Sequence, residues 1–306
     1  MNMTLFTIKD RILPENLRRF PEISDPKDNI KRGFILIDKA GGMTSHDVVD
    51  DIRRIYGIRK VGHAGTLDPM VTGVLPIGLG EGTKLLRFLL ESGKIYFCEM
   101  VLHKDIDEDV VSRTLHEQIG TITQLPPVKS RVKRVNRERD IYSLDIKSIK
   151  GRKVFFEVYC EAGTYIRKLC HDVGEQLGIG AHMQGLERLS AGGFKIEETV
   201  KVETLKSLKT SDSAEYLNYL YPVEKMIEHK PKIWIADDAA RTISQGAQLA
   251  APGVLGFESF EEGDFVFLQR ADGFLVAVAQ AAMSSDEAQT INRGIIAKPH
   301  KIIKLV

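Results

Sequence analysis

The chain has 306 residues, 43% of them hydrophobic, which is enough for two ordinary folded domains. It carries 43 Lys and Arg residues against 42 Asp and Glu, a net charge of +1, so it is not a protein that holds nucleic acid by bulk positive charge. No apolar run approaches the roughly 20 residues that span a bilayer, and the N-terminus lacks a signal pattern. We therefore expect a cytoplasmic protein with no membrane partner.

The first elements are predicted from residues 1–61. Residues 1–32 are polar and contain three prolines, which indicates an arm packed on another part of the chain rather than a domain. The apolar run at 34–37 predicts a strand. Thr44 and Asp47 have the spacing of a capping box, so a helix is expected to begin there and to end at Gly57.

Residues 62–80 place a single carboxylate, Asp68, among glycines, prolines and aliphatic side chains. The glycines and prolines require a backbone that turns repeatedly, and the hydroxyls of Thr66 and Thr72 are available to orient the carboxylate. A surface turn is the simplest interpretation of an Asp-Pro pair. The aliphatic neighbours instead favour partial burial, and an ionised Asp in such a place needs a partner.

A partner for this carboxylate is predicted about a hundred residues further on. A strand over 154–160 is followed by a turn at Gly163 and by a helix whose apolar spacing continues to Gly178. Arg167 lies in the first turn of this helix, beside the apolar stripe. Its guanidinium can reach a carboxylate there through two parallel hydrogen bonds, although a solvated surface arginine is the alternative.

A group of basic residues lies between these two segments, and we call this group the basic ribbon. Only Glu138 interrupts the group, and valines at 128, 132 and 135 alternate with it, as if they lay beneath. The pattern favours a ribbon that follows a phosphate backbone over a solvated charged face. Its members are Lys129, Arg131, Lys133, Arg134, Arg137 and Arg139.

The remaining chain divides into a helical connector at 201–230 and a small β-rich module after it. Short strands separated by glycine turns are predicted near 233–235, 263–268, 273–278 and 294–297.

The three cysteines lie in apolar surroundings without a paired spacing, so we expect buried reduced thiols. The eight histidines have no metal-ligand spacing, and the glycine-rich run at 78–84 lacks the spacing of a phosphate loop. We expect no metal and no organic cofactor.

Four runs of residues resemble, in order and spacing, the motifs of the TruB family of RNA pseudouridine synthases. They occupy 38–46 (Asp-Lys-x-x-Gly-Met-Thr-Ser-His), 62–69 (Gly-His-Ala-Gly-Thr-Leu-Asp-Pro), 94–97 (Lys-Ile-Tyr-Phe) and 163–167 (Gly-Thr-Tyr-Ile-Arg). The resemblance extends from about 33 to 189 and resumes in the C-terminal region. Within the family the chain is most similar to the archaeal and eukaryotic dyskerin-type branch, the catalytic subunit of H/ACA guide ribonucleoproteins.

The resemblance implies a role for particular side chains. Asp68 corresponds to the catalytic aspartate, Arg167 to the arginine paired with it, and Tyr96 to the tyrosine that stacks on the target base. Leu189 corresponds to the leucine that lines the uracil pocket. The other residues of the implied substrate pocket are Lys39, His63 and Tyr165. The chain departs from the family pattern at Ala40, Ala64, Met70 and Leu125.

The implied fold is α/β (α+β), with two domains after the arm at 1–32. A mixed-sheet catalytic domain with the connector is expected over 33–230, followed by a small β-barrel-like PUA domain over 231–306. The segment 246–254 resembles the RNA-facing element of PUA domains, whereas from the residues alone it is a plain loop after a helix. The expected RNA contacts in it are Gly246, Ala247, Pro252 and Gly253.

The implied activity is the isomerisation of specific uridines to pseudouridine in rRNA and/or tRNA. The implied partners are the RNA substrate, an H/ACA guide RNA, a small zinc-ribbon-like protein, a small β-barrel protein and a kink-turn-binding protein. Bacterial-type enzymes usually carry an inserted RNA-clasping loop where segment 124–142 passes directly into the next strand. Its absence favours the guided enzyme over a stand-alone tRNA enzyme that acts on the T-loop uridine.

Two readings from other classes are less consistent with the residues. A glycoside or nucleoside hydrolase needs a second carboxylate near Asp68, and no motif segment offers one in a similarly apolar setting. A non-catalytic RNA-binding scaffold does not need Asp68, Tyr96 and Arg167 together.

Overall fold

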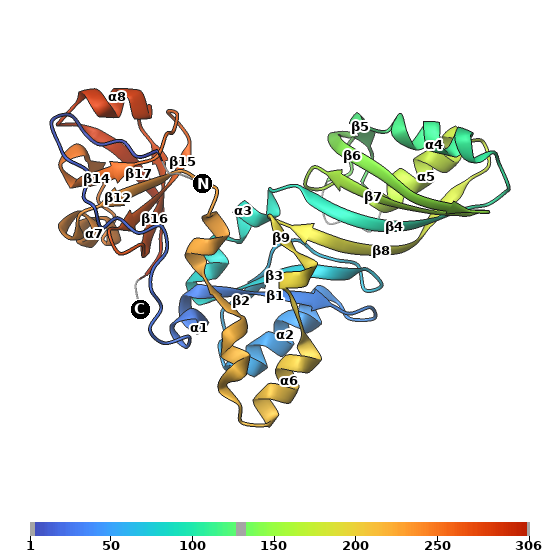
Figure 1. The fold of residues 1–306 in the computed structure, drawn as a ribbon, viewed down its shortest axis with the longest axis horizontal. Helices are drawn as coiled ribbons and strands as arrows, with labels where there is room; N and C mark the ends of the chain where they lie inside the picture. The colour runs from blue at the N-terminus through green and yellow to red at the C-terminus, as the bar shows by residue number, and fades with distance from the viewer. Residues whose placement is uncertain (1–3, 127–132, 305–306) are drawn as a thin grey trace. The chain divides into compact units, whose positions relative to one another are not determined.

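The computed structural model describes residues 4–126 and 133–304. By its internal contacts the chain forms two compact units (Figure 1). The larger unit comprises Ile35–Ile77 and Leu86–Tyr219. The smaller unit comprises Met1–Phe34, Gly78–Leu85 and Leu220–Val306.

The first sheet is mixed, as predicted, with the strand order β10-β1-β3-β8-β4-β7-β6-β5. β1 pairs with β10 and β3 with β8 in parallel, whereas β4 pairs antiparallel with both β7 and β8. Strands β11, β2 and β9 pair at the side of this path. The strands are β1 (Gly33–Lys39), β2 (Val61–His63), β3 (Thr72–Leu79), β4 (Lys94–Leu102), β5 (Gly120–Gln124), β6 (Arg137–Lys150), β7 (Lys153–Cys160), β8 (Ala181–Ala191), β9 (Phe194–Lys195), β10 (Val200–Lys201) and β11 (Leu220–Pro222).

Local signals set the helices of the larger unit. The predicted capping box at Thr44 and Asp47 is confirmed, and Gly57 ends α2 in the left-handed conformation. Helix α5 packs on β4 and β8, and α4 packs on β6 and on α5 (Figure 1). The helices are α2 (Ser45–Tyr56), α3 (Leu86–Leu90), α4 (Glu108–His116), α5 (Ile166–Gln176) and α6 (Val202–Thr210), with 3₁₀ turns η2 (Ile196–Glu198) and η3 (Ala214–Tyr219).

The segment predicted as a connector begins as a packed helix of the larger unit. Helix α6 lies against α2, where Lys206 Nζ is 2.7 Å from Asp51 Oδ2. The Tyr56 hydroxyl of α2 also donates to the carbonyl oxygen of Tyr216, which follows α6, at 2.8 Å. The residues up to Tyr219 therefore help to cover one side of α2.

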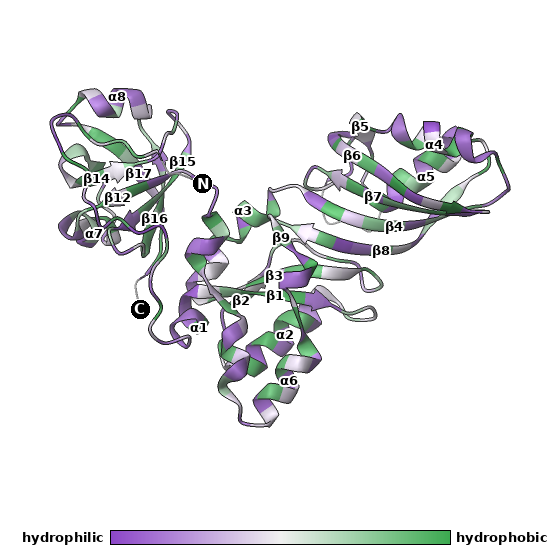
Figure 2. Cartoon of the chain, viewed as in Figure 1, coloured by the Kyte–Doolittle hydropathy of each residue, from purple (hydrophilic) through white to green (hydrophobic). Residues whose placement is uncertain are grey.

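Helix α5 packs on one face of β4, and the residues on that face are buried. Buried and half-buried residues alternate along it, and hydrophobic and hydrophilic residues mix along the strands in Figure 2. The buried face carries Tyr96 and Cys98, and Cys98 Sγ lies 3.6 Å from Cys170 Sγ in α5. The three cysteines are buried and free, as predicted, and burial raises the pKa of Cys160 to about 12.

The smaller unit contains a sheet with the order β13-β17-β16-β15-β12-β14, in which each predicted C-terminal strand appears. Its core consists of aliphatic and aromatic side chains of this sheet packed with side chains of α7 and α8. The strands are β12 (Lys232–Ile235), β13 (Leu249–Ala250), β14 (Val254–Phe257), β15 (Phe265–Arg270), β16 (Leu275–Ala281) and β17 (Ile295–Ile302). The helices are α1 (Asp28–Arg32), α7 (Asp237–Ser244) and α8 (Ser285–Thr290), with 3₁₀ turns η1 (Gly80–Lys84), η4 (Val223–Ile227) and η5 (Ala251–Gly253).

The N-terminal arm packs on this C-terminal sheet. Phe6 and Phe257 exchange backbone hydrogen bonds of 2.8 and 2.9 Å. The carbonyl oxygen of Arg18 accepts from Trp234 Nε1 at 2.7 Å and from Gln269 Nε2 at 3.0 Å. Both of these side chains are fully buried, so the arm supplies an acceptor that they need away from water.

Gly73 in β3 tests how tightly the central strands approach. Its φ is +101°, and a Cβ added there would lie 2.3 Å from the carbonyl oxygen of Arg188 in β8. Gly120 has a similar φ of +108° but open space around it. Both substitutions to Ala should cost about 1–2 kcal/mol for the left-handed backbone, and Gly73→Ala should cost about 1–3 kcal/mol more from the clash. Urea unfolding of the two variants measures the difference, and equal losses would contradict the close approach.

Candidate active site

Asp68 lies in the loop between β2 and β3. Leu67 and Val71 are buried, whereas the Asp68 side chain is 59% exposed. The Asp68 carbonyl oxygen accepts from the Val71 N–H at 3.0 Å and closes a turn that presents the carboxylate to solvent. The predicted partial burial of Asp68 is therefore wrong, because successive residues of a tight turn point in different directions. The aliphatic neighbours face the core, and the carboxylate does not.

The backbone of this loop is anchored on both sides of Asp68. Before it, Ser45 Oγ at the start of α2 accepts from the Leu67 N–H at 3.0 Å. After it, Lys39 Nζ donates to the Pro69 carbonyl oxygen at 3.0 Å. The position of the carboxylate is therefore set by side chains from β1 and α2, and Ser45 is a positioning residue that sequence reasoning missed.

Lys39 is fully buried, and backbone carbonyls surround its ammonium. Besides Pro69, the Met43 and Ala40 carbonyl oxygens accept from Nζ at 2.7 and 3.0 Å. Burial lowers the pKa of Lys39, and the guanidinium of Arg188 lowers it further. The resemblance implied a place in the substrate pocket. The structure directs the ammonium into the Asp68 loop, which Lys39 holds in place, and the implied role in the pocket stays a prediction.

Arg167 reaches Asp68 from the first turn of α5. Its Nη2 donates to Asp68 Oδ2 at 2.9 Å, which confirms the predicted pairing. The contact joins one nitrogen to one oxygen rather than forming the predicted two-bond fork, and the Arg167 side chain is 61% exposed. Such an exposed pair contributes only about 0–1 kcal/mol to stability. A need to stabilise the fold therefore does not explain this arrangement.

The start of α5 is held by Gln124, another residue that sequence reasoning missed. Its side chain is buried at the end of β5, where Oε1 accepts from the Tyr165 N–H at 2.9 Å and Nε2 donates to the Tyr165 carbonyl oxygen at 3.1 Å. Tyr165 is the residue before α5 and is partly buried. The two bonds fix the chain two residues before Arg167. A single Gln at a strand end gives no sequence signal for a partner 41 residues away.

Tyr96 lies on the buried face of β4, opposite Arg188 of β8. Burial raises the pKa of Tyr96, and the positive charge of Arg188 opposes the rise. Arg188 is 1% exposed, and it donates from Nε to the Val74 carbonyl oxygen at 2.7 Å and from Nη2 to the Gly65 carbonyl oxygen at 3.2 Å. Sequence reasoning missed Arg188 because it lies inside a strand, outside the four motif runs.

Leu189, the expected uracil contact, lies at a bulge between β4 and β8. Ile95 pairs with Ser190 and Tyr96 pairs with Arg188, so Leu189 has no opposite residue in this register. It is half-buried. Arg188 rather than Leu189 thus lies opposite Tyr96, and the role of Leu189 stays a prediction.

His63 is half-buried at the end of β2, with its ring centroid 5.8 Å from that of His46 in an edge-on arrangement. Its pKa is lowered by burial first and then by His46 and Arg188, so the imidazole is mainly neutral at pH 7. His63 Nδ1 is buried, and in the described part of the chain it has no hydrogen-bond partner. A neutral ring with such a nitrogen suits the expected place in a ligand pocket, which remains a prediction.

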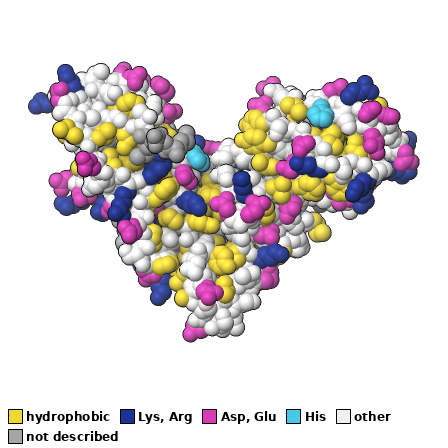
Figure 3. Space-filling model, in the orientation of Figure 1, with side chains coloured by type: hydrophobic (Ala, Val, Ile, Leu, Met, Phe, Trp, Pro, Cys, Tyr) yellow, Lys and Arg dark blue, Asp and Glu magenta, His cyan; other side chains and the backbone are white. Residues whose placement is uncertain are grey.

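The basic ribbon is only partly within the described residues. Val135 is 41% exposed, so it does not lie beneath the ribbon, and Arg139 pairs with Glu161 at 3.5 Å. The exposed members are Lys133 and Arg134. The members outside the described residues are Lys129 and Arg131. Acidic and basic side chains are interspersed on the face shown in Figure 3, consistent with a net charge of +1.

The predicted RNA-facing segment of the C-terminal module follows α7. Gly246, Ala247 and Pro252 are exposed, and Gly253 is half-buried. Gly246 has a φ of +99°, which places a left-handed turn directly after the helix. The N-terminal arm reaches this segment, because Arg11 Nη1 donates to the Pro252 carbonyl oxygen at 2.9 Å. The segment is therefore an ordered, accessible surface of the smaller unit.

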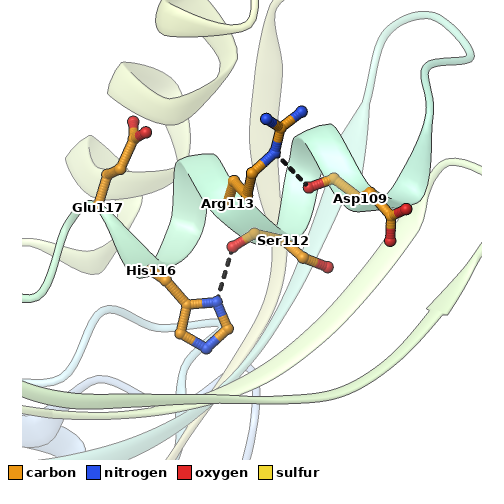
Figure 4. A pocket seen from close by; sticks show the side chains of 5 residues that line it. All are labelled: Asp109, Ser112, Arg113, His116 and Glu117. Atoms are coloured by element: carbon orange, nitrogen blue, oxygen red, sulfur yellow. Dashed lines mark hydrogen bonds between the residues drawn. The ribbon is translucent and has the colours of Figure 1, made fainter.

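A shallow hollow beside α4 does not coincide with the site (Figure 4). The two bonds drawn there, from His116 to Ser112 and from Arg113 to Asp109, are local to one helix. Across residues 4–126 and 133–304, no three His, Cys, Asp or Glu side chains are grouped to hold a metal. The helices of the same residues are too short or too polar to cross a bilayer.

The geometry defines what the site can do. A carboxylate held at a fixed place in solvent, with a guanidinium beside it, is suited to act as a nucleophile or a base on a ligand that covers it. In the described residues Asp68 and Arg167 are both exposed, so the free chain does not exclude water from the carboxylate. A large ligand such as a nucleic acid, which itself excludes water, fits this open arrangement.

Three family models match consecutive parts of the chain. Residues 53–166 match "TruB family pseudouridylate synthase (N terminal domain)". Residues 167–228 match "tRNA pseudouridylate synthase B C-terminal domain". Residues 231–303 match "PUA domain". The predicted PUA domain is thus confirmed, and the fold class predicted from the resemblance is as observed.

Relatives and solved structures match nearly the whole chain. A probable tRNA pseudouridine synthase B of Methanosarcina mazei is 42% identical over 289 residues, which cover 92% of this chain and 86% of the relative. A chain of a Cbf5–Nop10–Gar1 complex is 37% identical with a TM-score of 0.87, covering 99% of this chain and 95% of that one. A chain of an H/ACA RNP bound to a substrate RNA containing 2′-deoxyuridine is 36% identical with a TM-score of 0.86, covering 100% and 96%.

Lys94, two residues before Tyr96, gives a test by pH. It is buried, donates from Nζ to the Leu90 carbonyl oxygen at 2.7 Å, and has a pKa lowered to about 8 by burial and then by Arg188. Between this value and the ordinary 10.5, the unfolded chain binds a proton that the folded chain has released, so this contribution raises stability with pH. The free energy of unfolding of the wild type, minus that of Lys94→Met, should grow by about 1–2 kcal/mol from pH 7 to 9.5. Urea titrations at both pH values measure it. A constant or falling difference would contradict the buried ammonium.

Proposed function

This chain belongs to the TruB family of pseudouridylate synthases, isomerases that act on RNA, and we propose that it modifies specific uridines as the catalytic subunit of an H/ACA guide RNA–protein complex. The observation that carries the proposal is the similarity to chains of H/ACA complexes over almost the full length of both chains. That similarity includes the arm and the C-terminal module as well as the residues around Asp68. The proposed substrates are uridines in rRNA, tRNA or both.

The reaction exchanges one bond of the uracil for another. The C1′–N1 bond breaks, the base turns without leaving, and C5 joins C1′ while the C5 proton is lost and N1 becomes protonated. Asp68 is the group proposed to start this exchange, either by attack on C1′ or by removal of the C2′ proton. Arg167 orients its carboxylate, and Tyr96 supports the flipped base by stacking.

The exposure of Asp68 supports a substrate that arrives as a large ligand. In the free chain the carboxylate and Arg167 are in solvent. A bound RNA with its target uridine flipped out would cover both groups and provide the dry surroundings that the chemistry needs. His63, with its buried and unpaired Nδ1, is proposed to contact the same nucleotide.

The proposed partners supply part of the RNA grip. Strand β5 ends at Gln124 and β6 begins at Arg137, so residues 125–136 join them without room for a long clasping insertion. The net charge of +1 also leaves the chain without a strong general attraction for phosphates. A guide RNA, a small zinc-ribbon-like protein, a small β-barrel protein and a kink-turn-binding protein are proposed to compensate. The segment 246–254 is the proposed anchor for the guide.

A second candidate is a stand-alone enzyme acting on the T-loop uridine of tRNA. The names of the curated relatives, probable tRNA pseudouridine synthase B, favour it. Both candidates share the chemistry at Asp68 and differ in whether a guide RNA selects the uridine.

The dependence of uridine conversion on a guide RNA separates these two functions, and the Asp68→Asn variant tests the nucleophile. With an H/ACA guide RNA and the partner proteins, the chain should convert one uridine that pairs with the guide's pocket, and much less without the guide. Asp68→Asn keeps the side-chain size but removes its charge, so conversion should fall by at least about 1,000-fold while RNA affinity stays within about twofold. Primer extension after carbodiimide treatment measures pseudouridine at the target position. Equal conversion of a tRNA T-loop without any guide would favour the stand-alone enzyme, and residual turnover within tenfold would refute the role of Asp68.

Substitution of Arg167 separates its effect on catalysis from its effect on folding stability. Because its pair with Asp68 is exposed, Arg167→Met should change the free energy of unfolding by less than about 1 kcal/mol, yet slow the single-turnover rate by at least about 100-fold. Arg152→Met is the matched control, since Arg152 forms an exposed pair with Asp105 at 2.8 Å. That control should show the same small stability change with normal turnover. Equal turnover of the two variants would refute the assignment.

A further inference from the structure

We infer that Arg188 is a positioning residue for the reaction, which holds the backbone on both sides of Asp68 and lies opposite Tyr96 in the neighbouring strand. The inference rests on the proposed function for its catalytic consequence, although its structural part does not depend on it. No motif run includes Arg188, and the roles implied by the family resemblance do not include it. Its contacts alone assign the role.

The guanidinium of Arg188 joins backbone atoms from both sides of Asp68. Arg188 Nη2 donates to the Gly65 carbonyl oxygen, three residues before Asp68, and Nε donates to the Val74 carbonyl oxygen, six residues after it. The same residue pairs with Tyr96 across the two neighbouring strands, and its positive charge acts on the Tyr96 side chain. Arg188 therefore ties the two ends of the loop to the strand that carries the proposed base-stacking residue.

A lysine in place of Arg188 would not reproduce these contacts. A guanidinium is planar and offers donors in several fixed directions, so one side chain satisfies the carbonyl oxygens of Gly65 and Val74 at once. A lysine ammonium at the same place has a single nitrogen and cannot span the same groups. The backbone around Arg188 is also fixed, because Gly73 of β3 packs against its carbonyl oxygen.

The contribution of Arg188 to folding stability does not by itself explain an arginine at this position. It is almost fully buried, and its positive charge opposes protonation of the neighbouring Lys39, Lys94 and His63. Crowding cations in a buried place costs folding free energy, and apolar side chains of similar volume usually stabilise such a position as well or better. The cluster is therefore consistent with selection for the geometry of the Asp68 loop.

The experiment compares three variants of the full chain. Arg188→Met keeps the approximate length and removes every donor, whereas Arg188→Lys keeps the charge and a single donor nitrogen. Leu144→Ala is the matched control, because Leu144 is buried in β6 of the same sheet and its truncation costs about 2–5 kcal/mol without touching the loop. Hydrogen exchange of the amides of residues 64–72 is measured on the free chain, and single-turnover rate and RNA affinity are measured in the guided reaction.

Arg188→Met should speed exchange across 64–72 and slow the single-turnover rate about 100-fold, with RNA affinity within about twofold of wild type. Arg188→Lys should recover part of both losses. Leu144→Ala should lower the stability without either effect. Exchange in Arg188→Met equal to that in Leu144→Ala, or a rate within threefold of wild type, would overturn the inference.

The test also covers a variant that does not fold and a wild-type chain that shows no activity. If Arg188→Met does not fold, Arg188→Lys carries the comparison, and normal loop exchange together with normal turnover in that variant would overturn the inference. If the wild-type chain forms no pseudouridine under any condition, the proposed function fails. The exchange comparison then still decides whether Arg188 holds the loop.

Discussion

The structure around Asp68 depends on one constraint, which is that buried side chains hold the backbone of the loop while its carboxylate remains in solvent. Lys39 and Arg188 are buried cations that donate to carbonyl oxygens of this loop and, for Arg188, also of the strand after it, and Ser45 accepts from the residue before the aspartate. Burying a cation is costly unless its donors are satisfied. Because loop carbonyls supply acceptors, the loop and the cations each need the other's geometry.

This arrangement separates stability from reactivity. The stable contacts are those between buried donors and the backbone, whereas the pair of Asp68 with Arg167 is exposed and contributes little to folding. The carboxylate is thus ready for a ligand without the fold depending on its charge. Under the proposed function this is an advantage, because a bound RNA would cover the site and remove the water that weakens electrostatic contacts in the free chain.

In the smaller unit, the N-terminal arm packs on the C-terminal sheet and accepts hydrogen bonds from its buried side chains. The N-terminal arm supplies backbone acceptors for the buried Trp234 and Gln269, so the arm completes the sheet that contains the PUA match. The accessible segment at 246–254 lies on this same unit. Under the proposed function, the chemistry takes place at the Asp68 loop of the larger unit, and the C-terminal module of the smaller unit recognises the guide RNA.

The sequence by itself determined the features that are local. The capping box at Thr44, the stop at Gly57, the alternating strands and the four motif runs all depend on residues close together in the chain, and the pairing of Asp68 with Arg167 followed from motifs whose order was recognisable. Only the tertiary structure decided the rest. The exposure of Asp68, the inward direction of Lys39, the bulge at Leu189 and the buried Gln124 and Arg188 depend on which strands become neighbours and in what register. Periodicity cannot encode such contacts, because their partners are tens to more than a hundred residues away and their acceptors are backbone atoms common to every residue.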